Sequence, residues 1–465
     1  MKIPESLPYL PDHQHESSAI KKTLKRSNSL SKIESQTETD ISFLNTTHAF
    51  DRPSLKSLVE NKNIIIVSNR GLSSINNTLS ALPGGLATAV IDSLYSISKA
   101  QDGNQSASWI SWDGKNNQTQ TGVAVHYPPG EGTNSHPFNV HQFSIEKDLL
   151  DTFYRVVNNQ TLFPALHSDP ADSEYTRSII PCSNADWDKY EEVNGLFAQY
   201  AFNCLSPGKE NLVWFQDSQI MMAPKKLRTL IENSDIQDLL KDTKIGYFHH
   251  MTWPDKQSLI NCLISRDEVW GKDLGTGLRR AVALANTLLQ CDALGFHIPK
   301  DAKNFVSLIE DEQVNHHLKD LNDAFSIRFD GSNNTITIAY NNVHKNYHEV
   351  KIEAHPIGIT ANNDNIDLGK TESTADAKHE IISQLTTRWK EGNELGINDQ
   401  TKDVFLDPNT LIFYSIERHE PNKNTNLRID AIEKYLETSM PKNKIIFMMT
   451  LAPTRGDIPY YRDYR

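Results

Sequence analysis

The sequence lacks several features that would assign it to large classes of proteins. It holds only four cysteines in 465 residues, with no CxxC pair, so neither a disulfide framework nor a cysteine zinc site is predicted. No apolar run approaches the roughly 18 to 20 residues that a membrane span requires. The first residues contain no apolar core typical of a secretory signal. These absences predict a cytoplasmic protein with free thiols and no membrane partner.

Basic residues are fewer than acidic ones. The chain has 47 Lys and Arg against 59 Asp and Glu, a net charge of -12, which argues against nucleic acid as a partner over the whole surface. A hydrophobic fraction of 38% and a charged fraction of 23% are typical of a globular protein with some disordered sequence. The length exceeds that of one ordinary core and suggests two domains.

Apolar periodicity is scarce in residues 1–60, which are rich in Ser, Lys, Glu, Thr and Gln. Such a segment buries too little surface to offset its chain entropy, so we predict a disordered N-terminal tail over 1–60. The tail carries one basic cluster, which we interpret as part of a solvated segment in preference to a lipid-binding or partner-binding patch. The cluster consists of Lys21, Lys22, Lys25 and Arg26.

Beyond the tail, strand-like runs alternate with helical patterns, which predicts an α/β architecture with parallel sheets. The expected strands are 64–67, 212–215, 245–249 and 293–298, and the expected helices are 86–97, 145–157, 188–203, 222–232 and 277–290. We place one domain at 61–352. A second, at 353–465, has a helical pattern at 374–390, strands at 411–414 and 444–449, and a helix at 426–438. At roughly 30 residues per unit, this second sheet is expected to be small.

Candidate functional residues follow several of the expected strands. Arg70 ends the first strand, and Gly84 and Gly85 open the next helix, where free N–H groups can bind a phosphate. Asp217 and His250 follow two further strands, and the carboxyl ends of parallel strands meet at one edge, where open α/β sheets bind ligands. Because adjacent histidines point to opposite faces of a strand, only one of the pair at 249 and 250 can face a site, and no metal site is predicted.

Further candidates are more ambiguous when taken singly. Aromatic residues spaced like Tyr154 and Phe163 are more often core than a sugar platform. Arg418 and Lys423 come just after the strand at 411–414, and Arg455 follows the last strand. Cations at one edge of a sheet suit a pyrophosphate leaving group, although each alone is more often a solvated surface charge.

In their order along the chain, these segments resemble trehalose-6-phosphate synthases, retaining glucosyltransferases with two facing Rossmann-like domains (GT-B). The resemblance runs from about residue 62 to the last residue and is most specific at 67–70 with 84–85, 214–224, 245–254, 295–297, 356–359 and 453–457. The segments at 248–250 and 295–299 are also similar to glucosylglycerol-phosphate synthases. Arg70 within Ser-Asn-Arg favours the trehalose-phosphate branch.

The resemblance implies a transfer of glucose from a nucleotide-glucose to glucose 6-phosphate with retention of configuration, without a metal or other cofactor. It leaves the nucleotide open among UDP, GDP and ADP, and a homo-oligomer possible. The implied acceptor-binding residues are Arg70, Tyr154, Phe163, Asp217 and Arg455. The implied donor-binding residues are Gly84, Gly85, His250, Arg418 and Lys423. The implied catalytic residues are His250, Asp217, Arg418 and Lys423.

The sequence departs from this family at several positions. The family's His-Asp-Tyr-His is here Gln216-Asp217-Ser218-Gln219, which keeps only the acid, and Pro421 changes the loop between the two donor cations. The family's later acidic motif is not found before residue 465. We therefore expect a truncated second domain and a chain that binds sugar phosphate but transfers glucose slowly or not at all. The alternatives are a glucosylglycerol-phosphate synthase-like enzyme and a weak or inactive sugar-phosphate-binding regulatory relative.

Overall fold

The computed structural model describes most of residues 54–356 and 404–453. The gaps inside these ranges are 76–77, 82–84, 103–106, 114–122, 126–137, 168–178, 237, 268–274, 342–346, 405–406, 408, 421–422 and 440–443. The predicted helix at 374–390 and most of the predicted tail lie outside the described residues. The last residues of the predicted tail include helix α2 (Leu55–Val59), with the Ser54 hydroxyl capping its N-terminus.

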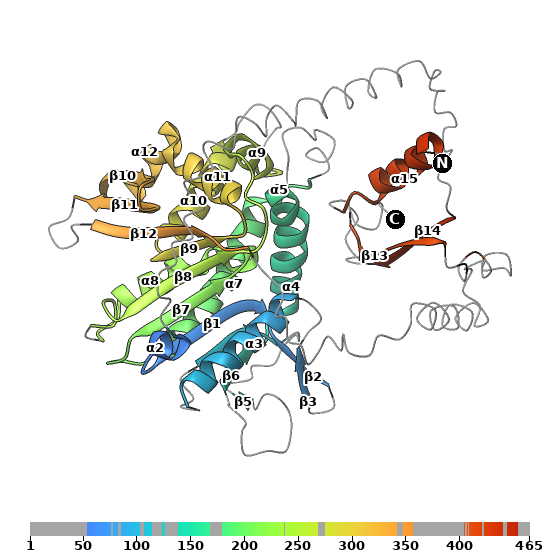
Figure 1. Ribbon diagram of the computed structural model, residues 1–465. Coiled ribbons are helices and arrows are strands. Elements are labelled where there is room, and N and C mark those ends of the chain that lie inside the picture. The colour runs from blue at the N-terminus through green and yellow to red at the C-terminus, as the bar shows by residue number, and fades with distance from the viewer. Residues whose placement is uncertain are drawn as a thin grey trace, which may run out of the picture.

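One ten-stranded sheet organises the chain up to residue 354 (Figure 1), in the order β10-β11-β12-β9-β8-β7-β1-β4-β6-β5. All strands from β12 to β6 in this order are parallel, as predicted, whereas β10, β11 and β5 pair antiparallel with their neighbours. The strands are β1 (Asn63–Arg70), β4 (Ala107–Trp112), β5 (Val123–Val125), β6 (Phe138–Phe143), β7 (Asn211–Gln216), β8 (Thr243–His249), β9 (Ala293–Phe296), β10 (Ala324–Asp330), β11 (Thr335–Tyr340) and β12 (Tyr347–Ala354).

The first strand shows how the sequence specifies this sheet. Its run of three isoleucines and a valine is buried on both faces, as expected for an inner strand of a parallel sheet. Ile65 and Val67 join the larger core on one face, and Ile66 joins a smaller core on the other. Strand β12 continues to Ala354, two residues past the predicted domain boundary at 352/353, which stays a prediction.

The two faces of the sheet are covered unequally. The larger core packs beneath most of the helices, and the smaller core packs beneath helix α3 (Gly85–Ala100) over β1, β4 and β6. On β7 the side chain of Trp214, on the second face, is 41% exposed. The helices over the larger core are α4 (Lys147–Leu150), the π-helix η2 (Asp151–Leu162), α5 (Phe163–Leu166), α7 (Asn184–Asn203), α8 (Ala223–Glu232), α9 (Lys256–Cys262), α10 (Gly275–Leu288), α11 (Pro299–Glu310) and α12 (Glu312–Leu321).

The remaining described elements are a hairpin, a short turn and a C-terminal unit. The hairpin β2 (Leu72–Ile75) and β3 (Thr78–Ala81) lies between β1 and α3, and the 3-10 turn η3 (Ser218–Ile220) follows β7. In the C-terminal unit, β13 (Leu411–His419) and β14 (Ile445–Pro453) are parallel and are connected through α15 (Thr425–Ser439). The predicted strands and helix of this region are thereby confirmed, with longer strands than expected.

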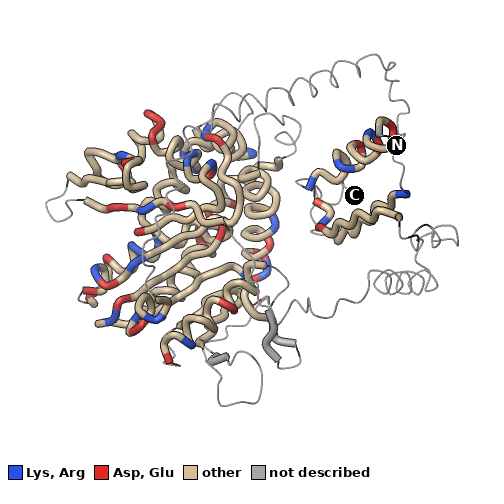
Figure 2. The backbone as a smooth tube through the Cα atoms, in the orientation of Figure 1, with Lys and Arg blue, Asp and Glu red and all other residues tan. Residues whose placement is uncertain are grey.

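Figure 2 shows acidic and basic residues alternating over the helices and strand ends of the described part of the chain. No helix among the described residues is long and apolar enough to span a membrane.

Candidate active site at the carboxyl edge of the sheet

Asp217 stands at the carboxyl end of β7 with an unusual backbone. Its φ of 71° and ψ of 170° fall in a region that residues other than glycine rarely occupy, at a cost of about 1 to 3 kcal/mol. The conformation is held by β8, because the Asp217 N–H donates to the Phe248 carbonyl at 2.8 Å. The Asp217 Oδ1 accepts from the His250 N–H at 3.3 Å. A residue with a strained backbone and a carboxylate side chain at this edge makes the edge a candidate functional site.

His250 lies beside this carboxylate, directly after β8. Its Nε2 is 2.8 Å from the carboxamide oxygen of Gln216. Its ring centroid is 4.7 Å from that of Phe248 and 5.4 Å from that of His297. Burial lowers the pKa of His250, the charge of Asp217 raises it and His297 lowers it. The ring is therefore held mainly in its neutral form at neutral pH.

His249 takes the opposite direction, as predicted from strand alternation. It is fully buried, with Nδ1 3.1 Å from the Tyr247 hydroxyl and Nε2 3.2 Å from the Thr252 carbonyl. Burial lowers the pKa of His249 to about 4. This histidine belongs to the core below the site, and only His250 lies at the edge of the sheet.

Arg70 and Tyr154 form a second pair, at the adjoining end of β1. The Arg70 Nη2 donates to the Tyr154 hydroxyl at 2.6 Å, and the guanidinium carbon lies 5.0 Å from the Tyr154 ring centroid. This is the only side-chain hydrogen bond of Arg70 within the described part of the chain, so most of its five N–H donors are available to an anion. Ser68 of β1 is paired in register with Gln216 of β7, so Arg70 and Asp217 leave adjacent strands at the same edge.

Tyr154 is presented by η2, a π-helix where the sequence predicted an ordinary helix at 145–157. Side chains of the helix support the wider turn by donating to carbonyls five residues earlier. Asn158 donates to Phe153 at 2.7 Å, and Asn159 donates to Tyr154 at 2.6 Å. π-Helical turns are frequent at functional sites, and this one positions the Tyr154 hydroxyl next to Arg70.

Phe163 and Lys423 both lie near His167, whose pKa also responds to the charge of Asp217. The Phe163 ring centroid is 4.3 Å from that of His167, and the His167 Nδ1 donates to the Phe163 carbonyl at 2.7 Å. Burial lowers the pKa of His167, the charge of Asp217 raises it and that of Lys423 lowers it. Lys423 is thus close enough for its charge to act on the same ring as Asp217. The Arg418 Nη1 lies 3.3 Å from Oε1 of Glu420, which is fully buried.

Three predicted site residues, Gly84, Gly85 and Arg455, remain. Gly85 begins α3 at the carboxyl edge and is exposed, and a Cβ there would meet no atom within 4 Å. Its place at a helix N-terminus suits a phosphate. Gly84 and Arg455 lie outside the described residues. Among the described residues, no group of three or more His, Cys, Asp and Glu side chains could hold a metal; independence from metals stays a prediction.

Sequence reasoning assigned no role to Gln216, His297 or Phe248, which complete the surroundings of His250. His297 directly follows β9, and the Phe248 ring packs against Gly295, where a Cβ would come within 2.4 Å of the ring. Their position could have identified two of them, because Gln216 and His297 each lie at the end of a predicted strand. Their contacts depend on the register of β8 with β7 and β9, which no local pattern specifies.

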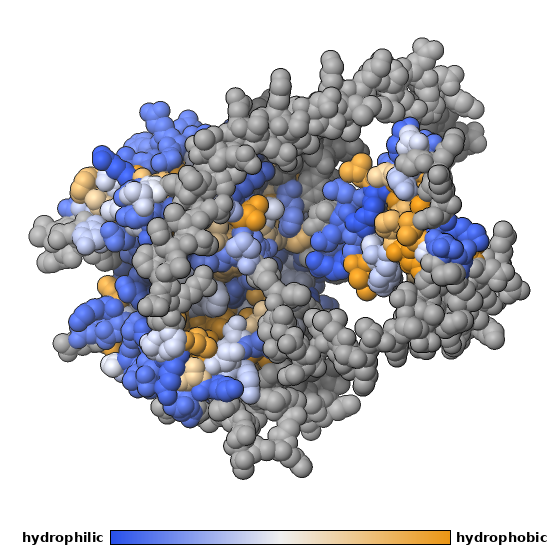
Figure 3. Space-filling view, viewed as in Figure 1, coloured by the Kyte–Doolittle hydropathy of each residue, from blue (hydrophilic) through white to orange (hydrophobic). Residues whose placement is uncertain are grey.

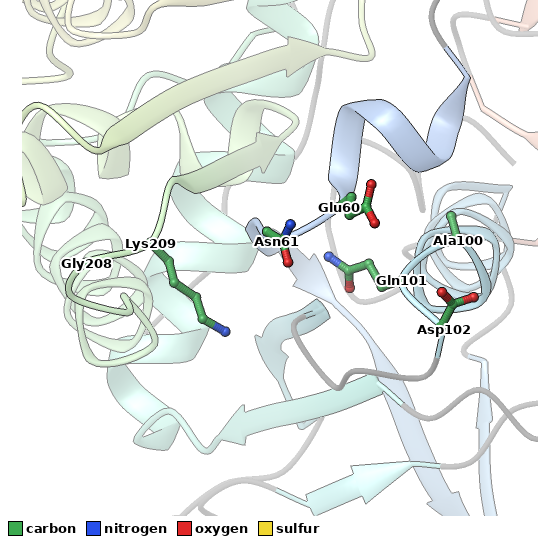
Figure 4. Close-up of a pocket in the computed structure, with 7 residues that line it drawn as sticks. All are labelled: Glu60, Asn61, Ala100, Gln101, Asp102, Gly208 and Lys209. Carbon is green, nitrogen blue, oxygen red and sulfur yellow. The ribbon is translucent and has the colours of Figure 1, made fainter.

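A separate polar pocket lies at the opposite, amino end of the sheet (Figure 4). Its residues precede β1 and β7 or follow α3, and none of the predicted site residues is among them. Ligands of open α/β sheets bind at the carboxyl ends of the strands, so this pocket is not the candidate active site. It is lined by Glu60, Asn61, Ala100, Gln101, Asp102, Gly208 and Lys209.

The family model of glycosyltransferase family 20 matches residues 62–465. The chain is a member of this family. The family 20 chain is 23% identical over 409 residues to a trehalose-6-phosphate synthase of Mycobacterium sp. (strain JLS), with 85% of this chain and 66% of that protein covered. It is 29% identical over 169 residues to the glucosylglycerol-phosphate synthase of Synechocystis sp., with 36% and 27% covered.

Solved structures show the same GT-B fold. An alpha,alpha-trehalose-phosphate synthase (UDP-forming) from Burkholderia xenovorans, in complex with glucose-6-phosphate, matches with a TM-score of 0.53 and 22% identity, covering 87% of this chain and 68% of that one. The E. coli protein bound with UDP-2-fluoro glucose matches with a TM-score of 0.56 and 20% identity, covering 87% and 67%. The family 20 chain spans 58% to 66% of the length of its first four curated relatives.

Proposed function

We propose that this family 20 member is a retaining glucosyltransferase that transfers glucose from a nucleotide-glucose to glucose 6-phosphate. The observation that carries the proposal is the meeting of two pairs at one edge of the sheet: Arg70 with Tyr154, and the strained Asp217 with His250. A cation that stays charged and a carboxylate beside a neutral imidazole suit a ligand with both a phosphate and several hydroxyl groups.

The acceptor binds at the end of β1 and β7 in this proposal. Arg70, oriented by the Tyr154 hydroxyl, binds the phosphate dianion, because the planar guanidinium matches phosphate oxygens with two parallel hydrogen bonds. Asp217 accepts hydrogen bonds from the sugar hydroxyls, and the Phe163 ring shapes one side of the site. Arg455 provides a second cation for the same phosphate.

The donor binds between this edge and the C-terminal unit at 353–465, which serves as the nucleotide-sugar domain. Gly85 and its neighbour Gly84 let the backbone approach the nucleotide, and His250 contacts the donor sugar. Arg418 and Lys423 bind the diphosphate. Proteins similar to this chain support this assignment. One is named as UDP-forming, and another was solved with UDP-2-fluoro glucose.

The proposed chemistry needs charge stabilisation above all. When the bond from the anomeric carbon to the diphosphate breaks, negative charge develops on the leaving group. Cations already in place at Arg418 and Lys423 stabilise that transition state more than the ground state. Closure of the two domains brings acceptor and donor together and excludes water, which would otherwise hydrolyse the donor.

A second candidate is a transfer to a polyol phosphate, as in glucosylglycerol-phosphate synthases. The similarity of the chain to the Synechocystis protein over 169 residues favours it. A smaller acceptor would use the same phosphate-binding Arg70 but make fewer contacts with Asp217.

A transfer assay on the purified chain tests the proposal. Glucose 6-phosphate and glycerol 3-phosphate are offered in turn with UDP-, GDP- and ADP-glucose. The glucosylated phosphate product and the released nucleoside diphosphate are both quantified. We expect product with glucose 6-phosphate at a rate at least tenfold above that with glycerol 3-phosphate. The reverse preference supports the second candidate, and binding of sugar phosphate without transfer from any donor contradicts the enzymatic proposal.

A further inference from the structure

The carboxamide of Gln216 occupies a buried position directly beneath the candidate site. Gln216 is the last residue of β7, its side chain is 3% exposed, and it lies in register between Ser68 of β1 and Phe248 of β8. Its Oε1 is 2.8 Å from the Nε2 of His250. Within the described part of the chain, the other ring nitrogen of His250, Nδ1, has no hydrogen-bond partner.

This contact has a definite consequence for the ring. A carboxamide oxygen only accepts hydrogen bonds, so the nitrogen that faces it must carry the proton. A neutral imidazole has a single N–H, so Nδ1 is then left with a lone pair. The titratable groups around the ring are Asp217, His249 and His297, and burial lowers the pKa of His250, which favours the neutral form.

Packing fixes the ring in place independently of this hydrogen bond. The Phe248 ring lies 4.7 Å from the His250 ring and 5.2 Å from the His297 ring, centroid to centroid. Phe248 can take this position only because residue 295 is glycine, since a Cβ there would come within 2.4 Å of the ring. Orientation is therefore set by the aromatic contacts, and the site of protonation by Gln216.

We propose that Gln216 is a positioning residue that holds His250 as the Nε2–H tautomer and leaves Nδ1 to accept a hydrogen bond from a sugar hydroxyl. The half concerning the sugar rests on the proposed function, and the half concerning the tautomer does not. His250 then selects a ligand atom that can donate a proton. A hydroxyl satisfies this requirement, whereas a phosphate oxygen, an ether oxygen or a fluorine does not.

Nitrogen-15 NMR of the full chain with labelled histidine tests the tautomer. The His250 signals are assigned by their loss in His250→Asn. We expect a protonated Nε2 and an unprotonated Nδ1 in the ligand-free protein. Gln216→Met, which is similar in length but has no acceptor, should give a mixture of tautomers. The control Gln219→Met, three residues further on, should keep the single tautomer of the native chain. A protonated Nδ1 in the native chain, or an unchanged tautomer in Gln216→Met, overturns the proposal.

Gln216→Glu keeps the test decisive if Gln216→Met does not fold. A carboxylate oxygen still accepts from Nε2–H, so the tautomer should persist, while the added negative charge should raise the pKa of His250 by about one unit or more. An unchanged pKa in this variant means that residue 216 does not contact the ring, and it also overturns the proposal.

Titration with ligands tests the sugar half. Glucose 6-phosphate, UDP-glucose and their monofluorinated glucose analogues are added while the Nδ1 signal is followed. We expect the native sugar to shift the Nδ1 signal and one fluorinated analogue to leave it unshifted. Gln216→Met should weaken sugar binding about threefold to tenfold, the effect of losing one hydrogen bond. Saturation without any shift of Nδ1 overturns this half. A chain that binds neither sugar contradicts the proposed function and leaves the tautomer result intact.

Discussion

The ten-stranded domain and the C-terminal unit contain similar strand sequences with very different surroundings. The isoleucines of β1 are almost completely buried, whereas Phe413 and Ile416 of β13 are 49% and 69% exposed. Figure 3 shows the apolar side chains of the C-terminal unit at the surface. β1 has a strand on each side and core on both faces, whereas β13 is paired in the described part of the chain with β14 alone. An apolar run predicts a strand, but neighbouring elements decide its burial.

This difference has energetic consequences. A two-stranded sheet is marginal by itself, and three or more strands or a packed helix are needed for independent stability. In the C-terminal unit, α15 is bound to β13 by Arg428, whose guanidinium donates to both carboxylate oxygens of Glu417 at 2.6 and 2.9 Å. In the proposed function the acceptor residues Arg70, Tyr154 and Asp217 lie on the well-buried domain, whereas the donor residues Arg418 and Lys423 lie on the less buried unit.

Phenylalanine truncations test the comparison most directly and should have the largest effect. Phe215 of β7 is fully buried, so Phe215→Ala should lower the free energy of unfolding by about 3 to 5 kcal/mol. Phe413→Ala, at a half-exposed position, should cost less than about 1 kcal/mol. Denaturant unfolding and calorimetry measure both. Equal losses would mean that β13 is as well covered as β7.

Acid should destabilise the ten-stranded domain selectively. The pKa of His249 is about 4 in the folded protein, below its ordinary 6.5. The contribution of neutral His249 to the free energy of unfolding is therefore fully present above pH 6.5 and is lost as the pH falls toward 4. The loss is on the order of 3 kcal/mol, at about 1.4 kcal/mol per pKa unit. Burial also lowers the pKa values of His167, His250 and His348 in this domain.

The measurement is a set of denaturant unfolding curves between pH 7 and 4 for the native chain and His249→Gln. Fluorescence reports the ten-stranded domain because Trp109 and Trp253 lie in its core. The variant should be less stable at pH 7 but lose less stability on acidification. Parallel pH profiles would show that His249 titrates alike in the folded and unfolded states.

Arginine substitutions should separate the acceptor and donor halves. Arg70→Ala should weaken glucose 6-phosphate binding about tenfold to a hundredfold, the effect of losing a charged hydrogen bond of about 1.5 to 3 kcal/mol. It should change UDP-glucose binding less than about twofold, and Arg418→Ala should show the opposite selectivity. Titration calorimetry measures all four. Equal weakening of both ligands by Arg70→Ala would contradict the assignment of that residue to the acceptor.

Two glycines provide the smallest and most local test. Gly295→Ala places a Cβ within 2.4 Å of the Phe248 ring, whereas Gly85→Ala meets nothing within 4 Å. The first should cost about 1 to 3 kcal/mol, as for overpacking of a core, and should shift the NMR signals of His250. The second should stay within about 0.5 kcal/mol. A silent Gly295→Ala would mean that Phe248 moves freely and does not hold the His250 ring.

Much of the fold and part of the site could be predicted from local patterns. The strand at 64–67 and those ending before Asp217 and His250 were found because short apolar runs bounded by polar residues are typical of inner parallel strands. Six strands of the large sheet were missed: β4, β5, β6, β10, β11 and β12. For β10 and β11 the reason is that their faces are half polar and their stability depends on the sheet they extend. The hairpin of β2 and β3 was missed as well.

What the sequence determined by itself was therefore a set of strands in order, and the chemical groups that leave their carboxyl ends. The tertiary structure alone decided which of these groups meet: Arg70 with Tyr154, 84 positions away, and Gln216 with His250, 34 positions away. It also decided the positive φ of Asp217 and the exposure of Trp214. The physical reason is that strand register and burial depend on partners distant in the chain, whereas apolar periodicity records only whether a segment can be covered.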